Sequence, residues 1–316
     1  MTYSSGGLIQ ATDYNGFVST TVAANVNATW NSTYGQTALA TVSTGGTVSA
    51  TQWASLVNTL TSMGAHQPTT LTSRTAPTTG TTISILANVN TDLTNCYTNR
   101  YNAYAQGTQY TAWTGTNSKT TATSGATWTI TFTNTVTWAN ATAANNFFNS
   151  GGTVKIDVAK SSTGDLGDPE WNDLASTLCG DIYISGLATS HTIAGVAYTG
   201  TTKIGGTGTP TTLLTGTGWD ALVAGAAGTI VYKQFADTAP YTSNFIQHTI
   251  AKGATSTTLV ITTLWSASDG DAITGGTAPS GATPGTAPCT IVTYYPPETT
   301  YLTNTWGTPT VAATTT

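Results

Sequence analysis

The stretch "AANNFFNSGGTVKID", residues 143–157, places a short helix, two glycines and a strand next to one another. Residues 141–149 predict about two helical turns, and one of the two glycines can take the left-handed conformation that ends a helix. Residues 153–159 then alternate as in a strand. We predict that Phe147 and Phe148 pin this helix across a sheet and bury a large aromatic area.

The sequence on both sides of this stretch alternates between apolar and polar residues. Upstream, "SGATWTITFTNTVTWAN" at 124–140 has period two, which is typical of a half-buried strand. Several candidate strands follow later in the chain, separated at short intervals by turns rich in Gly and Pro. This pattern favours an antiparallel sandwich or a jelly-roll-like body. These candidate strands are 182–185, 192–199, 229–235, 244–251, 257–265 and 289–295. A second short helix is predicted at 169–178, with Asp168 as its N-cap.

The first third of the chain has helical periodicity instead. In 12–30, apolar residues recur every four positions, with Thr12 as the N-cap. In "TVSATQWASLVNTLTSMG" at 47–64, Ser49 and Gln52 form a capping-box pattern before an apolar face, and the final glycine predicts the helix end. A third helix is predicted at about 82–105.

The predicted fold class is therefore α+β. A helical assembly or attachment module spans residues 1–110, and a mostly antiparallel β-rich body spans 115–316, interrupted by the two short helices. The stretch 270–288 is interpreted as a long loop, and the tail from residue 296 has no clear period. Whether 161–316 forms a separate domain is left open by the pattern.

The composition argues against several functional classes. Only 7% of the residues are charged, compared with about 25% in a typical soluble domain. The net charge of -5 and the absence of a basic stripe argue against nucleic acid as a partner. There is no apolar run of the roughly 18 residues that a spanning helix needs. The start "MTYSSGGLIQ" does not have the pattern of a signal peptide, so we expect synthesis in a cytoplasm without one.

The sequence offers no catalytic constellation, and we expect no enzyme and no cofactor. His66, His191 and His248 each stand alone, without a second ligand at metal spacing, and no G-x-S-x-G elbow is present. The cysteines at 96, 179 and 289 lie far apart and are interpreted as small buried hydrophobic residues.

One acidic stretch allows two interpretations. "STGDLGDPEWNDLASTLCGD", residues 162–181, contains acidic residues at short spacing, and clustered oxygen ligands can bind calcium. The stretch lacks EF-hand spacing, and acidic residues also gather at helix N-termini to meet the helix dipole. The capping interpretation is preferred, and a cation site is the alternative. The residues concerned are Asp165, Asp168, Glu170, Asp173 and Asp181.

Aromatic residues allow one binding hypothesis. The chain has 9 Trp and 14 Tyr, most of them at core positions of helix stripes or strands. A carbohydrate site formed by Tyr294, Tyr295 and Trp306 is the alternative in which a host surface glycan would be the partner.

Several segments together resemble one protein family. The segments "DYNGFV", "VNATWNSTYGQ", "TQWASLVNTL", "YTNRYNA" and "FFNSGG" occur in this order, with the run 34–67 upstream of the strand "TFTNTVTW". The first 160 residues or so are similar in this respect to a family of tailed-bacteriophage virion proteins of tail or fibre type. The remainder of the chain carries no such resemblance.

The resemblance implies a structural component of the virion with no catalytic, cofactor-binding or metal-binding residues. It implies a location in a tail, baseplate or neck appendage, with a capsid head decoration or head fibre as the runner-up. Self-association is expected, with a trimer as the first choice for a fibre-like component, together with contacts to other virion proteins. A sparsely charged chain agrees with this, since few charges have to be desolvated at interfaces.

Overall fold

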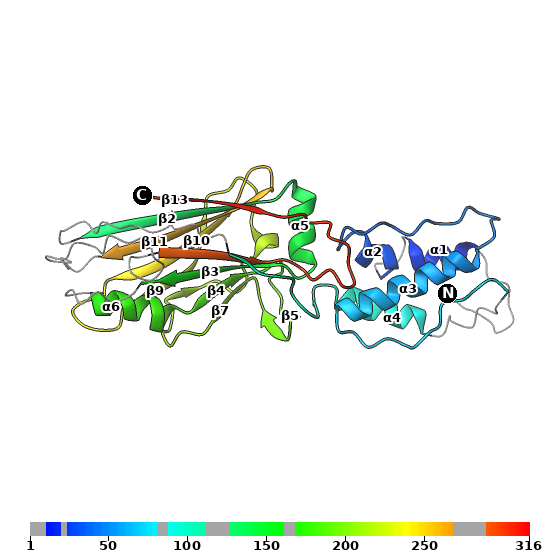
Figure 1. The fold of residues 1–316 in the computed structure, drawn as a ribbon, viewed down its shortest axis with the longest axis horizontal. Helices are drawn as coiled ribbons and strands as arrows, with labels where there is room; N and C mark the ends of the chain where they lie inside the picture. Colours follow the sequence, from blue (N-terminus) through cyan, green and yellow to red (C-terminus); the bar gives the residue numbers. More distant parts are fainter. Residues whose placement is uncertain (1–10, 20–23, 81–87, 112–126, 161–167, 268–288) are drawn as a thin grey trace.

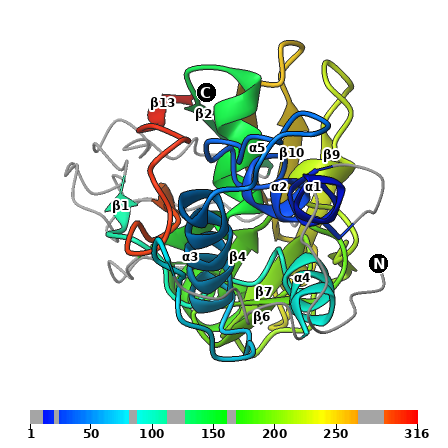
Figure 2. The ribbon, with the colours of Figure 1, turned by 90° about the vertical axis from the view of Figure 1, so that its right-hand side faces the viewer.

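The molecule is elongated, with helices at one end and a β-sandwich at the other (Figure 1). The structure is a computed structural model that describes residues 11–19, 24–80, 88–111, 127–160, 168–267 and 289–316. It confirms the predicted α+β class, with a helical N-terminal region and mostly antiparallel sheets. Seen from the helical end, α1–α4 lie in front of the sandwich (Figure 2).

The helical region is built around α3. Its N-cap Ser49 and Gln52 form the predicted capping box, with both reciprocal hydrogen bonds present. The ring of Trp53 is fully buried and meets Tyr14 at 5.4 Å and Phe17 at 6.0 Å between ring centroids, both edge-on. This edge-to-face geometry is favourable for aromatic pairs. The four helices are α1 (Ala11–Val18), α2 (Val26–Trp30), α3 (Ala50–His66) and α4 (Val89–Thr98).

The single helix predicted over 12–30 is wrong, because α1 and α2 are separate. Helix α1 already includes Ala11, so Thr12 lies inside it and is not its N-cap. Asn25 adopts an extended conformation, and its side chain accepts a hydrogen bond from the backbone N–H of Ala28 at 2.9 Å. An Asn that caps the backbone in this way starts a new helix. Residues 20–23, between the two helices, lie outside the described part.

The sequence had predicted that α3 ends at Gly64, and this prediction is wrong. The helix continues to His66 and is capped at Gln67. A Cβ on Gly64 would lie 2.6 Å from a methyl carbon of Leu71, so Leu71 would have to move to accommodate any side chain at this position. The glycine therefore allows the segment after α3 to pack back against the helix.

The helix predicted over 82–105 is shorter, and its first six predicted residues lie outside the described part. Helix α4 ends at Thr98, and the chain then turns away. The backbone N–H of Ala103 donates to Thr192 at 2.9 Å, and that of Tyr104 donates to His66 at 2.6 Å. These distant carbonyl groups replace the helical acceptors that a continued helix would have used.

The sandwich consists of two antiparallel sheets. The five-stranded sheet has the order β1-β12-β3-β4-β7, and the six-stranded sheet has the order β13-β2-β11-β10-β9-β8. Their strands are β1 (Tyr110–Thr111), β2 (Trp128–Thr137), β3 (Thr153–Ala159), β4 (Asp181–Ile184), β7 (Thr201–Ile204), β8 (Thr212–Leu213), β9 (Thr229–Phe235), β10 (Phe245–Lys252), β11 (Thr258–Ala267), β12 (Cys289–Tyr295) and β13 (Thr310–Thr315). The apolar core is one continuous cluster that extends from the interior of the sandwich into the helical region.

Two sequence interpretations need correction here. The strand predicted at 192–199 is a hairpin of β5 (His191–Ile193) and β6 (Val196–Tyr198). Ala194 and Gly195 both have positive φ between the two strands, as a tight hairpin turn requires. The tail, which showed no period, supplies the outer strand β13 of the six-stranded sheet.

The second predicted short helix begins at Asp168 as α6 (Asp168–Asp173) and continues as a π-helical turn, Leu174–Cys179. The ring of Trp171 is buried against Trp265 of β11 at 5.7 Å between centroids. This contact fixes the helix against the inner face of the six-stranded sheet.

The stretch "AANNFFNSGGTVKID" forms most of the helix α5 (Ala141–Asn149) and the first part of β3. Helix α5 lies across the end of the sandwich that faces the helical region (Figure 1). Phe147 and Phe148 are buried, and their rings lie 5.2 and 5.3 Å from that of Trp138. Phe148 also stacks on Trp219 at 5.0 Å. Gly151 has a φ of +95°, which is the predicted left-handed turn into β3.

The C-terminal segment connects the two ends of the molecule. It leaves β12, runs to the helical region and returns as β13 (Figure 1). At the far point of this path, the side-chain amide of Gln36 forms two 2.9 Å hydrogen bonds with the backbone of Thr303. Thr305 adds a hydrogen bond from its hydroxyl group to the carbonyl group of Tyr34 at 2.8 Å.

Phe148→Ala is expected to lower the free energy of unfolding by about 3–5 kcal/mol, because it leaves a cavity among rings that cannot collapse onto it. The measurement is urea unfolding at equilibrium, followed by fluorescence. Val223→Ala is the matched control, since Val223 is 71% exposed and its truncation should change stability by less than about 0.5 kcal/mol. Equal effects of the two substitutions would contradict a central role for the α5 aromatic cluster.

Candidate functional site

The helical region carries a groove of about 260 Å³ between α3 and the segment that follows it. Its lining is mainly methyl, methylene and hydroxyl groups, with one ionisable side chain, that of Arg74. Such a lining supplies neither a general base nor a nucleophile with an adjacent base, and it suits contact with another polypeptide. The lining residues are Val57, Leu60, Thr61, Gly64, Ala65, Thr69, Leu71, Thr72, Ser73 and Arg74.

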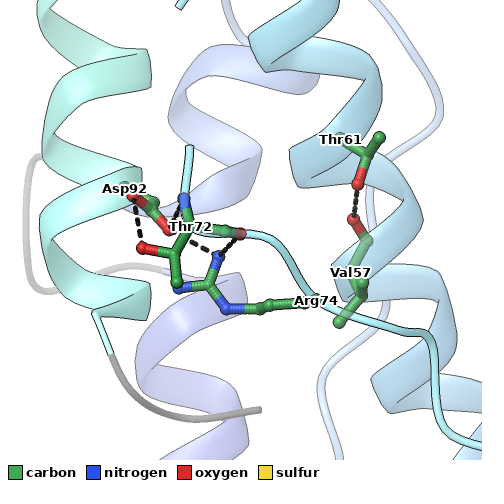
Figure 3. Close-up of polar contacts among 5 residues, drawn as sticks. All are labelled: Val57, Thr61, Thr72, Arg74 and Asp92. Atoms are coloured by element: carbon green, nitrogen blue, oxygen red, sulfur yellow. Dashed lines mark hydrogen bonds and ion pairs between the residues drawn. The ribbon is translucent and has the colours of Figure 1, made fainter. Parts of the chain in front are cut away.

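A buried ion pair shapes one wall of this groove. A guanidinium nitrogen of Arg74 lies 2.5 Å from a carboxylate oxygen of Asp92 on α4, and the two side chains are only 6% and 4% exposed. Thr72 donates its backbone N–H to the same carboxylate at 3.2 Å and accepts from Arg74 through its carbonyl group at 3.1 Å (Figure 3). Since both charges are satisfied in this way, the pair fixes segment 69–74 between α3 and α4.

The predicted aromatic site at the C-terminus is not a single exposed cluster. Tyr294 and Trp306 are 2% and 1% exposed, and the hydroxyl group of Tyr294 donates to the carbonyl group of Pro309 at 3.1 Å. Tyr295 points to the opposite face of β12, because side chains alternate along a strand. Tyr294 and Trp306 both line a pocket of about 310 Å³, together with prolines and polar side chains such as Glu298 and Asn304, but Tyr295 does not line it. The three residues therefore do not form one stacking face for a sugar.

The acidic stretch is only partly described. Asp165 and the side chain of Asp168 lie outside the described residues. Burial first, and then the carboxylates of Asp173 and Asp237, raise the pKa of Glu170. Asp181 pairs instead with Lys155 of β3 at 3.3 Å. Within the described ranges, no three His, Cys, Asp or Glu side chains are grouped in a way that could hold a metal ion.

The histidines lie apart from one another and inside the protein. Burial lowers the pKa of His66 to about 4 and that of His248 to about 3, so both are neutral at pH 7. His248 has its Nδ1 atom 2.9 Å from the hydroxyl group of Thr263, and Tyr232 stacks on its ring at 5.3 Å. His191 has its Nδ1 atom 2.9 Å from the carbonyl group of Thr189. Within the described residues, none of them forms an ion pair with a carboxylate.

Cys96, Cys179 and Cys289 are buried, as their sequence positions had predicted. Burial raises the pKa values of Cys96 and Cys179 to about 12. Thiols with such pKa values are almost fully protonated at pH 7 and are poor nucleophiles.

A polar patch that the sequence interpretation missed lies on the outer face of the five-stranded sheet. We call it the tyrosine–aspartate patch, and it consists of Lys155, Asp157, Asp181, Tyr183 and Tyr295. Lys155 lies directly opposite Tyr183 in the pairing of β3 with β4. Its ammonium group lies 3.6 Å from the carboxylate of Asp157 and 3.3 Å from that of Asp181.

The two tyrosines of the patch come from β4 and β12, the strands on either side of β3. Tyr183 and Tyr295 have ring centroids 6.2 Å apart, and both rings are half-buried. Tyr198 of the β5–β6 hairpin meets Tyr183 edge-on at 5.5 Å and borders one end of the patch. The alternation of side chains in "TVKID", "DIY" and "YY" indicates which face of its strand each patch residue occupies. The sequence does not show that β12, β3 and β4 are neighbours, and this strand order brings the residues together.

Comparison with known proteins gives no relative for this chain: family models, curated proteins and solved structures all lack a match to it. In the described parts of the chain, no helix is both long and apolar enough to cross a membrane.

Asp92→Asn should destabilise the protein by about 3–5 kcal/mol, because it leaves the buried guanidinium of Arg74 without its counter-charge. The double variant Arg74→Met, Asp92→Leu should lose clearly less, since it removes both charges together. Urea unfolding of the wild type, Arg74→Met, Asp92→Leu and the double variant gives the coupling free energy. A double variant that is as unstable as the sum of the single variants would contradict the pairing.

His248→Phe should make stability less sensitive to acid. The folded-state pKa of about 3 lies below the unfolded value of about 6.5, so protons bind preferentially to the unfolded chain as the pH falls between these values. The free energy of unfolding therefore falls by about 1.4 kcal/mol per pH unit in this range, and substitution by phenylalanine removes this contribution. Unfolding free energies of both proteins from pH 7 to pH 4 test this, and parallel curves would contradict it. Titrating carboxylates contribute equally to both curves.

Proposed function

We propose that this chain is a non-enzymatic structural component of a tailed-bacteriophage virion, in a tail, baseplate or neck appendage. The observation that carries the proposal is the elongated arrangement of a helical region and a β-sandwich joined by the C-terminal segment (Figure 1). The resemblance of the first 160 residues or so to tailed-phage virion proteins supports it.

The surface chemistry supports an assembly role. With 8 basic and 13 acidic residues in 316, few charges oppose close packing of neighbouring subunits. His66, His248, Cys96 and Cys179 are buried and uncharged at neutral pH, which favours a scaffold over a catalyst. In this proposal the chain forms a homo-oligomer, with a trimer as the expected state, inside the virion.

The helical region provides the attachment surface in this proposal. Its groove beside α3 combines the apolar side chains of Leu60 and Leu71 with the hydroxyl groups of Thr61 and Thr72. A mixed lining of this kind is common at protein interfaces, which join an apolar centre to a polar rim. A capsid head decoration or head fibre is the second candidate, because the same composition and shape would serve there.

The native mass of the full chain, measured by light scattering over a range of concentrations, is the first test. A concentration-independent trimer is expected. Immunogold labelling of phage particles with antibodies to the chain then gives its position, in an appendage or on the head. A monomer at all concentrations, together with particles that carry no label, would overturn the proposal.

Thr61→Arg tests the groove. Thr61 is exposed and lines the groove, so an arginine there should block a docking polypeptide without unfolding α3. We expect at least tenfold less of the variant in assembled particles or oligomers, with an unchanged melting temperature. Thr51→Arg is the matched control, because Thr51 is exposed on the same helix and does not line the groove. Equal incorporation of both variants would exclude the groove as the attachment surface.

A further inference from the structure

The tyrosine–aspartate patch concentrates charge in a chain that has little of it. Three of the chain's 21 charged residues, Lys155, Asp157 and Asp181, meet on two neighbouring strands. We propose that this patch is a binding site for a neutral sugar unit of a glycan.

The arrangement of the charges is not what sheet stability alone would select. The register of β3 with β4 places Asp157 and Asp181 on facing positions of the two strands, since Ile156 pairs with Ile182. Like charges that face each other across a sheet are destabilising. Burial and then repulsion from Asp181 raise the pKa of Asp157, and Lys155 offsets only part of this. Threonine, which is abundant on the other strands, would satisfy these positions without that cost.

The polar groups of the patch match the hydroxyl groups of a sugar. Two carboxylates offer acceptor atoms, and an ammonium group between them offers donors, so two adjacent hydroxyl groups can be held by charge-assisted hydrogen bonds. Both Asp157 and Asp181 keep about a third of their side-chain surface exposed, so their oxygens remain within reach of a ligand.

The tyrosines supply the apolar part of the site. The half-buried rings of Tyr183 and Tyr295 can pack against the C–H face of a sugar ring, while their hydroxyl groups remain at the polar edge. Tyr183 is held by Tyr198 and by the strands on both sides of it, so little conformational entropy is lost on binding.

The charge balance selects the class of sugar. Two carboxylates and one ammonium group give the patch a net charge of about -1 when all three are ionised. An anionic sugar, such as a sialic acid or a uronic acid, would be repelled, whereas a neutral hexose or N-acetylhexosamine would not.

The test uses the full chain in its native assembly state. Saturation-transfer NMR with glucose, galactose, mannose, N-acetylglucosamine and sialic acid finds the ligands, and titration calorimetry with a glycan that contains the preferred unit gives the Kd. We expect binding of at least one neutral sugar and none of sialic acid. Tyr183→Ala and Asp181→Asn should each weaken binding at least tenfold, whereas Tyr183→Phe should retain most of it.

Tyr241→Ala is the matched control, because Tyr241 lies in the loop between β9 and β10 on the other sheet. Melting temperatures verify that each variant is folded. Absence of binding to every neutral sugar, or equal binding by Tyr183→Ala and Tyr241→Ala, overturns the proposal. So does a change of native mass in folded Asp181→Asn, which would identify the patch as a subunit interface.

This inference goes beyond the proposed structural role and is tested separately from it. If the protein binds sugar but is absent from phage particles, the sugar site stands and the virion proposal fails. If particles carry the label but the isolated protein binds no sugar, the virion proposal stands and the sugar site fails.

Discussion

The packing of α5 across one end of the sandwich is the interaction on which the rest of the fold depends. Two sheets that face each other leave their apolar interior open at the ends of the strands. Here Phe147 and Phe148 close that end of the sandwich. Both rings contact Trp138, which directly follows β2, and Phe148 stacks on Trp219, which lies between β8 and β9. A single short helix thereby joins both sheets, and it lies at the end of the sandwich that faces the helical region (Figure 1).

Scarcity of charge is the second constraint, and it explains how the few charges are used. Arg74 is paired with Asp92 inside the helical region, where a lone charge would be costly. The ammonium group of Lys203 lies 2.9, 2.9 and 3.1 Å from three carbonyl oxygens of the loop 205–208 and so fixes that turn. The ammonium group of Lys252 lies over the ring of Trp219 at 4.3 Å. In these places a cation acts as a structural contact, which distinguishes them from the tyrosine–aspartate patch.

The elements with strong local signals were predictable from the sequence. The capping box of α3, the helix with two phenylalanines and the strands β9 and β12 depend on neighbours in the chain, so periodicity and turn chemistry locate them. Prediction failed where distant backbone groups decide the structure. Helix α4 ends at Thr98, and beyond it the backbone N–H groups of Ala103 and Tyr104 donate to Thr192 and His66, which lie far away in the sequence.

The candidate sites follow the same division. Lys155 and Asp157 share one strand, and their outward direction could be read from the alternation of "TVKID". The sequence could not show that Lys155 and Asp157 lie next to Asp181 and Tyr295, because this proximity depends on the strand order β12-β3-β4. The groove beside α3 was equally hidden, since it depends on the ion pair between Arg74 and Asp92, 18 positions apart in sequence.

The path of the C-terminal segment has a mechanical consequence for an elongated protein. Gln36 holds the segment at the helical region, and β13 holds its other end along β2. Strand β13 lies along the long axis of the molecule (Figure 1), so a pull between the two ends acts parallel to it. The hydrogen bonds between antiparallel strands are perpendicular to the strands and are then loaded in shear. Because many bonds must break together in that geometry, the segment resists separation of the two ends better than a flexible linker of the same length would.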